Sequence, residues 1–172
     1  MDNESTVVIN EDSDLPDNLK QVFEIWNALP KEPELPLASN FSLEQIPNKL
    51  LPWSVLADVI QSPLDFRFRF WGTERSNLIG AEMTGKYLSE ISAVVMREGN
   101  REEYESVCRN REAVICRTPV VAKSGITSTR LSMRLPLSND GIHVSRIYSA
   151  IDPNTVTLEQ YEVYGTTPRR RL

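Results

Sequence analysis

Few residues in this sequence could do chemistry at a catalytic or metal centre. His143 is the one histidine, and Cys108 and Cys116 are the two cysteines among 172 residues. A lone histidine lacks the partners that catalysis or haem ligation requires. The two cysteines have neither a second pair nor a nearby histidine to complete a zinc site, and they cannot form a disulfide framework. We therefore predict no metal site, and we expect the cysteines to be buried apolar residues.

Motifs for nucleotide binding and nucleophilic catalysis are also missing. The seven glycines form neither Gly-x-Gly-x-x-Gly nor a P-loop, and neither Ser-x-x-Lys nor Gly-x-Ser-x-Gly occurs. The adjacent carboxylates Glu102 and Glu103 fall in a predicted helix, where we expect them to lie on the solvated surface. The sequence thus predicts that the protein is not an enzyme.

Charge is distributed unevenly, and it limits the partners. Residues 1–36 carry a net charge of −7 within a total of −5, so the acidity belongs to an N-terminal arm. The three arginines at 169–171 are too few for a nucleic-acid interface. No apolar run approaches the roughly 20 residues of a membrane span, and the acidic N-terminus does not resemble a signal peptide. We expect a cytoplasmic protein without nucleic-acid partners.

An amphipathic helix is the first element that the spacing predicts, over residues 17–29. Its apolar stripe consists of Leu19, Val22, Phe23, Trp26 and Leu29. Asp17 is the expected N-cap, and the prolines at 30, 33 and 36 end the helix and extend the following chain. Ser42 to Gln45 has the pattern of a capping box.

Five strands follow from alternation and turn residues. Residues 66–71 place Phe66, Phe68 and Phe70 on one predicted face, and residues 129–137 place Leu131, Met133, Leu135 and Leu137 on one face. Residues 53–60, 116–123 and 142–151 complete the set, with turns at Ser124-Gly125 and Asp140-Gly141. A helix is expected from Glu98 to Ile115. Two strands, then helices, then a three-stranded meander indicate an α+β fold with helices on one face of an antiparallel sheet.

This order resembles that of a PAS domain. Leu50 to Val59, Phe66 to Thr73 (FRFRFWGT), Thr84 to Leu88 (TGKYL) and Leu135 to Gly141 are similar to a bacterial family of stand-alone PAS proteins. The resemblance implies a PAS-like five-stranded antiparallel sheet with short helices on one face and an N-terminal capping helix. It also implies a sensory or adaptor role without catalytic residues to carry over. Haem is unsupported, because PAS haem proteins usually bring their ligand from the helical segment and His143 lies in a predicted strand. Flavin is unsupported, because Cys108-Arg109-Asn110 only superficially resembles the photoreceptor context Asn-Cys-Arg.

The predicted organisation has four parts: a disordered acidic arm (1–16), an N-terminal helical extension (17–52), a PAS-like domain (53–152) and a C-terminal tail (153–172). The core is expected to be either fully packed or hollowed into a small apolar ligand pocket, with residues Phe68, Phe70, Tyr104, Cys108, Leu131, Met133 and Leu135. The opposite sheet face is expected to contact the capping helix or a second subunit, through Phe23, Trp26, Arg67, Arg69, Trp71, Arg130 and Arg134.

The predicted function is that of a sensory or adaptor domain that binds an unidentified signalling protein and forms a homodimer. The alternative is a cone-shaped α+β enzyme or carrier of the NTF2-like kind. Such a protein needs an acid or histidine inside an enclosed cavity, and Asp58 and His143 are the candidates.

Overall fold

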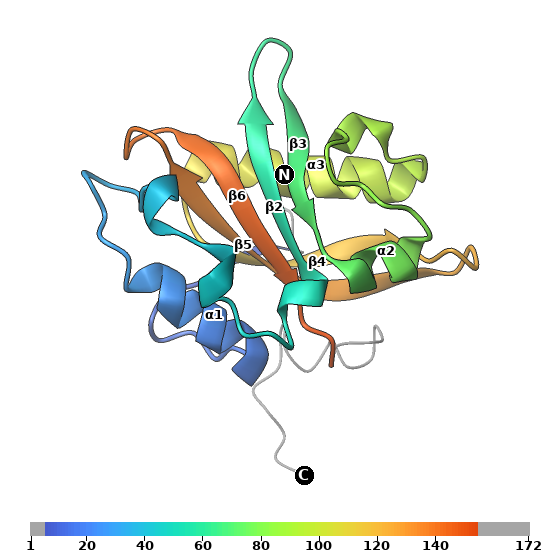
Figure 1. Ribbon diagram of the computed structural model, residues 1–172, viewed down its shortest axis with the longest axis horizontal. Helices are drawn as coiled ribbons and strands as arrows, with labels where there is room; N and C mark the ends of the chain where they lie inside the picture. Colours follow the sequence, from blue (N-terminus) through green and yellow to red (C-terminus); the bar gives the residue numbers. More distant parts are fainter. Residues whose placement is uncertain (1–5, 155–172) are drawn as a thin grey trace.

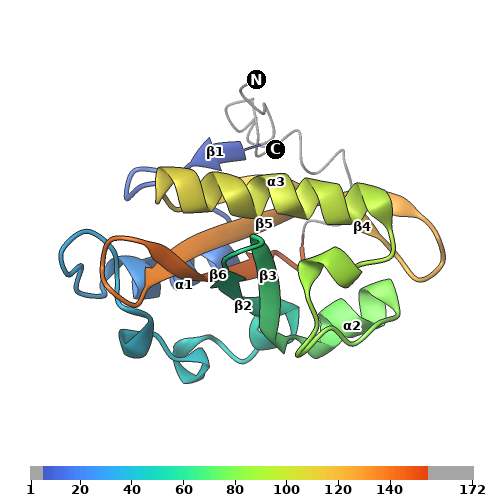
Figure 2. The same ribbon diagram turned by 90° about the horizontal axis from the view of Figure 1, so that it is seen from above.

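A six-stranded antiparallel sheet organises the protein in the computed structural model, which describes residues 6–154. The strands are β1 (Thr6–Val8), β2 (Ser54–Ile60), β3 (Asp65–Trp71), β4 (Val114–Val121), β5 (Thr127–Ser138) and β6 (Val144–Ile151). They lie in the order β1-β4-β5-β6-β2-β3. Figure 1 labels β2 to β6, and β1 is labelled in Figure 2. The five predicted strands are present. The additional strand, β1, pairs with β4 from a segment that the sequence analysis assigned to the disordered arm.

Helices cover both faces of this sheet. The α-helices are α1 (Asp17–Asn27), α2 (Thr73–Ile79) and α3 (Val94–Asn110), and short 3-10 helices span Ala38–Asn40, Leu43–Gln45, Leu51–Trp53 and Leu88–Glu90. Figure 2 shows α3 and α1 on opposite sides of the sheet. We call the side under α3 the inner face and the side under α1 the outer face.

The helix α1 forms because its apolar stripe has a surface to cover. Leu19, Val22, Phe23 and Trp26 are buried, as the spacing predicted, and the Trp26 indole Nε1–H donates to the Pro136 carbonyl at 2.8 Å. The predicted N-cap is wrong: Asp17 is the first helical residue, and no side chain caps the helix. The capping box at Ser42 and Gln45 is confirmed.

The chain that links α1 to β2 is anchored on the β5–β6 turn. The amides of Glu34 and Leu35 donate to the Gly141 carbonyl at 3.1 and 2.9 Å. Gly141 has a φ of 79°, and a β-carbon there would lie 1.5 Å from the Glu32 carbonyl oxygen. Glycine therefore serves both the turn and the close approach of the linker.

Two boundaries around α3 differ from the prediction. The helix begins at Val94 and ends at Asn110, where Arg111 adopts a left-handed conformation (φ 58°). Val114 and Ile115, expected at the end of the helix, are the first residues of β4 and pair with Arg134 and Met133. The apolar pattern was correct at these positions, but it fits a strand and a helix equally over so few residues.

Candidate functional site

A buried ion pair lies at the centre of the inner face. Arg134 of β5 and Glu103 of α3 have side chains 1% and 2% exposed, and the Arg134 Nε donates to Glu103 Oε2 at 2.8 Å. Arg134 also donates to Ser149 Oγ at 2.9 Å and to Asn100 Oδ1 at 2.8 Å. Thr118 Oγ1 donates to Glu103 Oε2 at 2.8 Å. The helix α3 and the strands β4, β5 and β6 thus each contribute a hydrogen-bonding group to this cluster.

Helical spacing on α3 brings these groups to the sheet. The buried residues of α3 are Met96, Asn100, Glu103, Tyr104 and Val107, which share one face at intervals of three and four. Glu103 therefore lies against the sheet, and the expectation that it is solvated is wrong. The signal for a buried carboxylate was present, since Glu103 shares this face with Tyr104 and Val107.

Aromatic rings enclose the ion pair. The Arg134 guanidinium lies 4.2 Å from the centroid of the Tyr104 ring, and that ring stacks on Phe66 with a centroid separation of 4.9 Å. Burial lowers the pKa of Arg134, but Glu103, with smaller contributions from Tyr104 and Cys116, leaves it raised above the ordinary arginine value. The interior beneath α3 therefore holds a hydrogen-bonded ion pair rather than an empty apolar chamber.

A second guanidinium enters the inner face from α2. Arg75 is 3% exposed, and its guanidinium carbon lies 4.9 Å from the centroid of the Trp71 ring. Sequence reasoning missed Arg75, because nothing in its neighbourhood distinguishes a buried arginine of a short helix from an exposed one. Only the position of α2 over the sheet decides its burial.

A cavity of about 420 Å³ opens beside this interior, which we call the rim pocket. It lies between the chain after α2, the start of α3 and the β4–β5 hairpin. Its wall includes Ile79, Met83, Ile91, Met96 and Val121, and Lys86, Glu90 and Lys123 also line it. The hairpin is held to α2, since the Lys123 amide donates to the Leu78 carbonyl at 2.9 Å.

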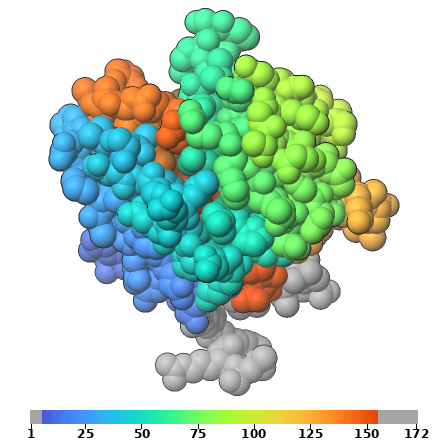
Figure 3. Space-filling model, viewed as in Figure 1, coloured from blue at the N-terminus to red at the C-terminus, as the bar shows by residue number. Residues whose placement is uncertain are grey.

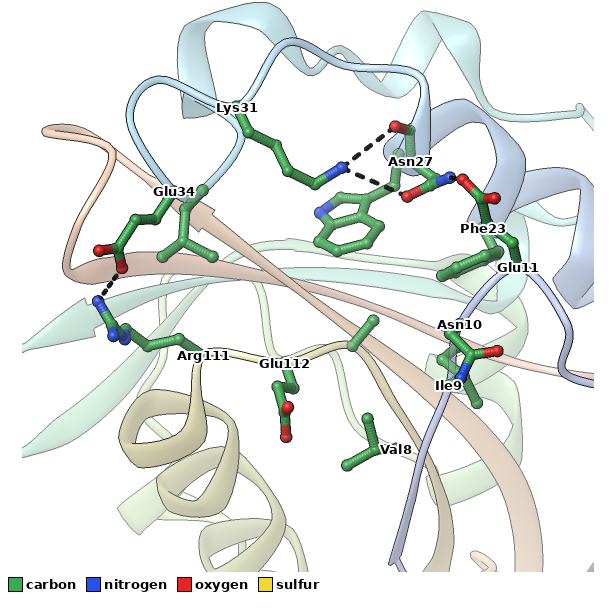
Figure 4. A pocket seen from close by; sticks show the side chains of 13 residues that line it. Val8, Ile9, Asn10, Glu11, Phe23, Asn27, Lys31, Glu34, Arg111 and Glu112 are labelled. Atoms are coloured by element: carbon green, nitrogen blue, oxygen red, sulfur yellow. Dashed lines mark hydrogen bonds and ion pairs between the residues drawn. The ribbon is translucent and has the colours of Figure 1, made fainter.

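Another cavity, of about 370 Å³, lies between α1, β1 and the turn at Arg111 (Figure 4). Its polar side chains bond to one another: Asn27 donates to Glu11 at 2.9 Å, Lys31 approaches Asn27 Oδ1 at 3.3 Å, and Arg111 pairs with Glu34 at 2.5 Å. These contacts connect α1 to the segment before it, and they connect Arg111 to the chain that links α1 to β2. The polar side chains of this cavity are therefore engaged in contacts that hold neighbouring segments together. The rim pocket is the stronger candidate for binding.

The predicted ligand pocket is divided between the two faces. Phe68 and Tyr104 are buried in the inner cluster, and Cys108 packs against it. Leu131, Met133 and Leu135 lie in the outer cluster under α1, and Phe70 packs there too. The single predicted pocket is therefore wrong.

A bulge and an inverted face produced that error. The register between β2 and β3 shifts between Leu56 and Ala57, so Arg69 is the extra residue and Phe70 changes face relative to Phe68. On β5 the alternation is correct, but its apolar side faces α1 and its Arg134 side faces α3. Because helices cover both faces, the alternation alone could not show which face is inner.

The predicted interface set also separates. Phe23 and Trp26 pack on their own sheet, which agrees with the capping role of α1. Trp71 and Arg134 are buried in the inner face, so their assignment to an outward surface is wrong. Arg67 and Arg69 are exposed, and Arg130 is half-buried. Homodimerisation stays a prediction.

The candidates of the alternative enzyme are not in an enclosed cavity. Asp58 pairs with Arg69 at 2.9 Å and with Arg146 at 2.8 Å. Burial raises the pKa of Asp58, but the hydrogen bonds from these two arginines leave it lowered overall. The His143 side chain is 82% exposed and bonds to Asp140 at 2.7 Å. Neither residue meets the condition for the cone-shaped enzyme.

Burial keeps the two cysteine thiols in their protonated form. Burial raises the pKa of Cys108 to about 11 and that of Cys116 to about 12, so both thiols stay protonated at neutral pH. Among residues 6–154, no group of three or more histidine, cysteine or acidic side chains could hold a metal ion. Within the same range, no helix is both long and apolar enough to cross a bilayer.

A sheet in this order, with a long helix across its inner face, defines the class of PAS-like sensory folds. The family model described as PAS domain matches residues 16–151, and the chain belongs to the PAS domain family. The match includes the N-terminal helix and linker, which the sequence analysis treated as an extension. No curated protein matches the chain significantly.

Two of the solved structures that resemble this chain are light-oxygen-voltage proteins. One is an RNA-binding light-oxygen-voltage receptor, with 13% identity and a TM-score of 0.52, and the match covers 91% of this chain and 40% of that one. The other is a fungal light-oxygen-voltage photoreceptor domain, with 17% identity and a TM-score of 0.45, covering 67% of this chain and 93% of that one. This chain thus spans less than half of the first receptor, and the likeness establishes the fold alone.

A flavin has a poor fit to this interior. The space between α3 and the sheet is filled by the Arg134–Glu103 pair and by the stacked rings of Tyr104 and Phe66. Cys108 belongs to the C-terminal half of α3, and Cys116 is buried on β4. The absence of haem and flavin stays a prediction.

Proposed function

We propose that this PAS domain is a non-enzymatic adaptor that binds a segment of another protein at the rim pocket. The observation that carries the proposal is a cavity with both apolar and charged lining residues, together with exposed apolar side chains that neighbour two of those lining residues in the sequence. Val94, next to the lining residue Ala93, is 59% exposed, and Ile126, next to the lining residue Gly125, is 68% exposed. Exposed apolar side chains that gather around a pocket are typical of binding surfaces.

The composition of the pocket suits an apolar anchor. Met83 and Met96 lie in its wall, and methionine adapts its shape to different apolar partners. The β4–β5 hairpin projects beside the segment of residues 80–95 in Figure 3, so a partner would meet the pocket edge on approach.

The charge around the pocket defines the other part of the partner. Two lysines, Lys86 and Lys123, and one carboxylate, Glu90, line the pocket. A partner segment that carries one apolar anchor and neighbouring acidic residues would complement this surface. The occupant that we propose is such a segment, supplied by a different protein.

The test is selection of 12-residue peptides from a random displayed library against the full chain, followed by fluorescence anisotropy with the selected peptides. The expected consensus is an aromatic or large aliphatic residue next to Asp or Glu. Ile126→Asp should weaken binding by about tenfold or more, because it places a carboxylate at the pocket edge. The matched control is Ile142→Asp, which changes an apolar residue 41% exposed at the β5–β6 turn.

Two results would overturn the proposal. One is a selection that yields no apolar and acidic pattern. The other is equal binding by the Ile126→Asp and Ile142→Asp proteins. Chemical turnover at the rim pocket would contradict the non-enzymatic role.

A further inference from the structure

Arg75 is a buried cation without a protein acceptor. Among residues 6–154 it forms neither an ion pair nor a hydrogen bond, and its close contact is the Trp71 ring. Stacking on an aromatic face attracts a cation, but it satisfies none of the five guanidinium N–H donors. A guanidinium with so little exposure is costly unless water or an anion reaches its N–H groups.

Trp71 provides a second unsatisfied donor at the same place. Its indole Nε1–H is buried and has no hydrogen-bond acceptor among the described residues. The ring is fixed from the side by Phe68, at a centroid separation of 4.8 Å. Because Arg75 stacks on this ring, the inner face holds two adjacent donor groups, and residues 6–154 offer no acceptor to either.

The balance of buried charge agrees with this picture. On the inner face, the fully buried charged residues among those described are Arg75, Arg134 and Glu103. Glu103 bonds to Arg134 and Thr118, so its carboxylate is already occupied. Burial lowers the pKa of Arg75 to about 10, and the positive Arg134 contributes to this lowering. Among the described residues, one positive charge is therefore left over on the inner face.

We propose that Arg75 and the Trp71 indole N–H bind a small carboxylate inside the domain. The planar guanidinium matches the two oxygens of a carboxylate, and the indole N–H adds a third donor. The inner face has an excess of one positive charge, which a ligand with a single negative charge would balance. The wall of Trp71 and Phe68 suits an apolar substituent on that anion. The site is separate from the rim pocket, whose wall does not include Arg75.

Thermal unfolding of the full chain tests this proposal. Sodium acetate, propionate, butyrate and benzoate are compared with sodium chloride and sodium phosphate at equal ionic strength and pH 7.5. At least one carboxylate should raise the midpoint in a concentration-dependent manner, since a ligand that binds only the folded state stabilises it. Chloride should not, and phosphate should have less effect than the best carboxylate.

Arg75→Met separates binding from a structural role. It removes the charge but keeps an apolar stem against Trp71, so the midpoint in chloride should stay equal or rise. Affinity for the best carboxylate should fall by about 100-fold or more. Trp71→Phe should weaken it by about tenfold, through loss of one N–H donor. Arg67→Met, at an exposed arginine of β3, is the matched control and should leave affinity unchanged.

Three outcomes would overturn the proposal. The first is the absence of any carboxylate-dependent shift in the unmodified protein. The second is an equal shift in the Arg75→Met and Arg67→Met proteins. The third is stabilisation by phosphate alone, which would assign the site to a different anion. None of these outcomes depends on whether the rim pocket binds a protein.

Discussion

The two faces of the sheet are both buried, but they are held by different interactions. The outer face packs Leu131, Met133 and Leu135 under α1, and its covering helix contributes two side-chain hydrogen bonds, from Trp26 to the Pro136 carbonyl and from Asn18 to Asp152. The inner face packs an Arg134–Glu103 pair under α3, with hydrogen bonds to three further side chains. The stability of the outer face thus comes mainly from apolar area removed from water. The stability of the inner face depends more on the positions of its hydrogen-bonding groups. Removal of one partner from such a hydrogen-bonded cluster leaves the other partner buried and unpaired, which is costly.

The largest expected effect is on the inner face. Glu103→Leu leaves the Arg134 guanidinium buried without its carboxylate, so the free energy of unfolding should fall by about 3–5 kcal/mol. Denaturant unfolding monitored by circular dichroism measures this change. The double variant Glu103→Leu with Arg134→Met removes both charges and should recover most of the loss. If the double variant were as unstable as the sum of the two single variants, the pair would not act as a unit.

An intermediate effect is expected on the outer face. Trp26→Phe keeps an aromatic ring against the sheet but removes the N–H that bonds to Pro136, at a cost of about 1–2 kcal/mol. Trp53→Phe is the control, because Trp53 is only half-buried and ends a 3-10 helix; its effect should stay below about 0.5 kcal/mol. Equal losses in the two proteins would contradict a specific role of the Trp26 hydrogen bond. The same denaturant curves provide the measurement.

This comparison also explains how far the sequence could lead. The stripe of α1 and the alternation of β5 predicted two surfaces that need cover, and both are covered. The order of elements and the likeness to PAS proteins gave the correct fold. Which surface of β5 faces α3 could not be predicted, because a pattern of period two has the same form when the strand is turned over.

The parts of the candidate site that were missed depend on contacts between distant segments. The bulge at Arg69 changes the face of Phe70, and no residue type in the segment FRFRFW indicates that a bulge occurs there. Arg75 becomes buried because α2 lies over Trp71, and Glu103 finds its partner 31 positions away on β5. Local periodicity reports on which residues share a face. Buried ion pairs and hydrogen-bond donors without an acceptor depend on which faces of distant segments pack together, and local periodicity does not report on that.

The smallest expected effect is a pH dependence that belongs to the inner face. Burial raises the pKa of Cys116 from 9.0 to about 12, so in the folded protein its thiol keeps a proton that the unfolded chain releases above pH 9. The unfolded state then binds fewer protons, and stability must fall as the pH rises through this range. Between pH 8 and pH 9.5 the loss from Cys116 should be somewhat below 1 kcal/mol.

Cys116→Ala should flatten that slope by the same amount, whereas Trp26→Phe on the outer face should leave it unchanged. Denaturant unfolding at pH 8.0, 8.5, 9.0 and 9.5 measures the slope for each protein. Cys108 is present in all of them, so the difference isolates the thiol on the sheet. An unchanged slope in the Cys116→Ala protein would mean that water reaches Cys116, and then the inner face would be less tightly closed than its ion pair indicates.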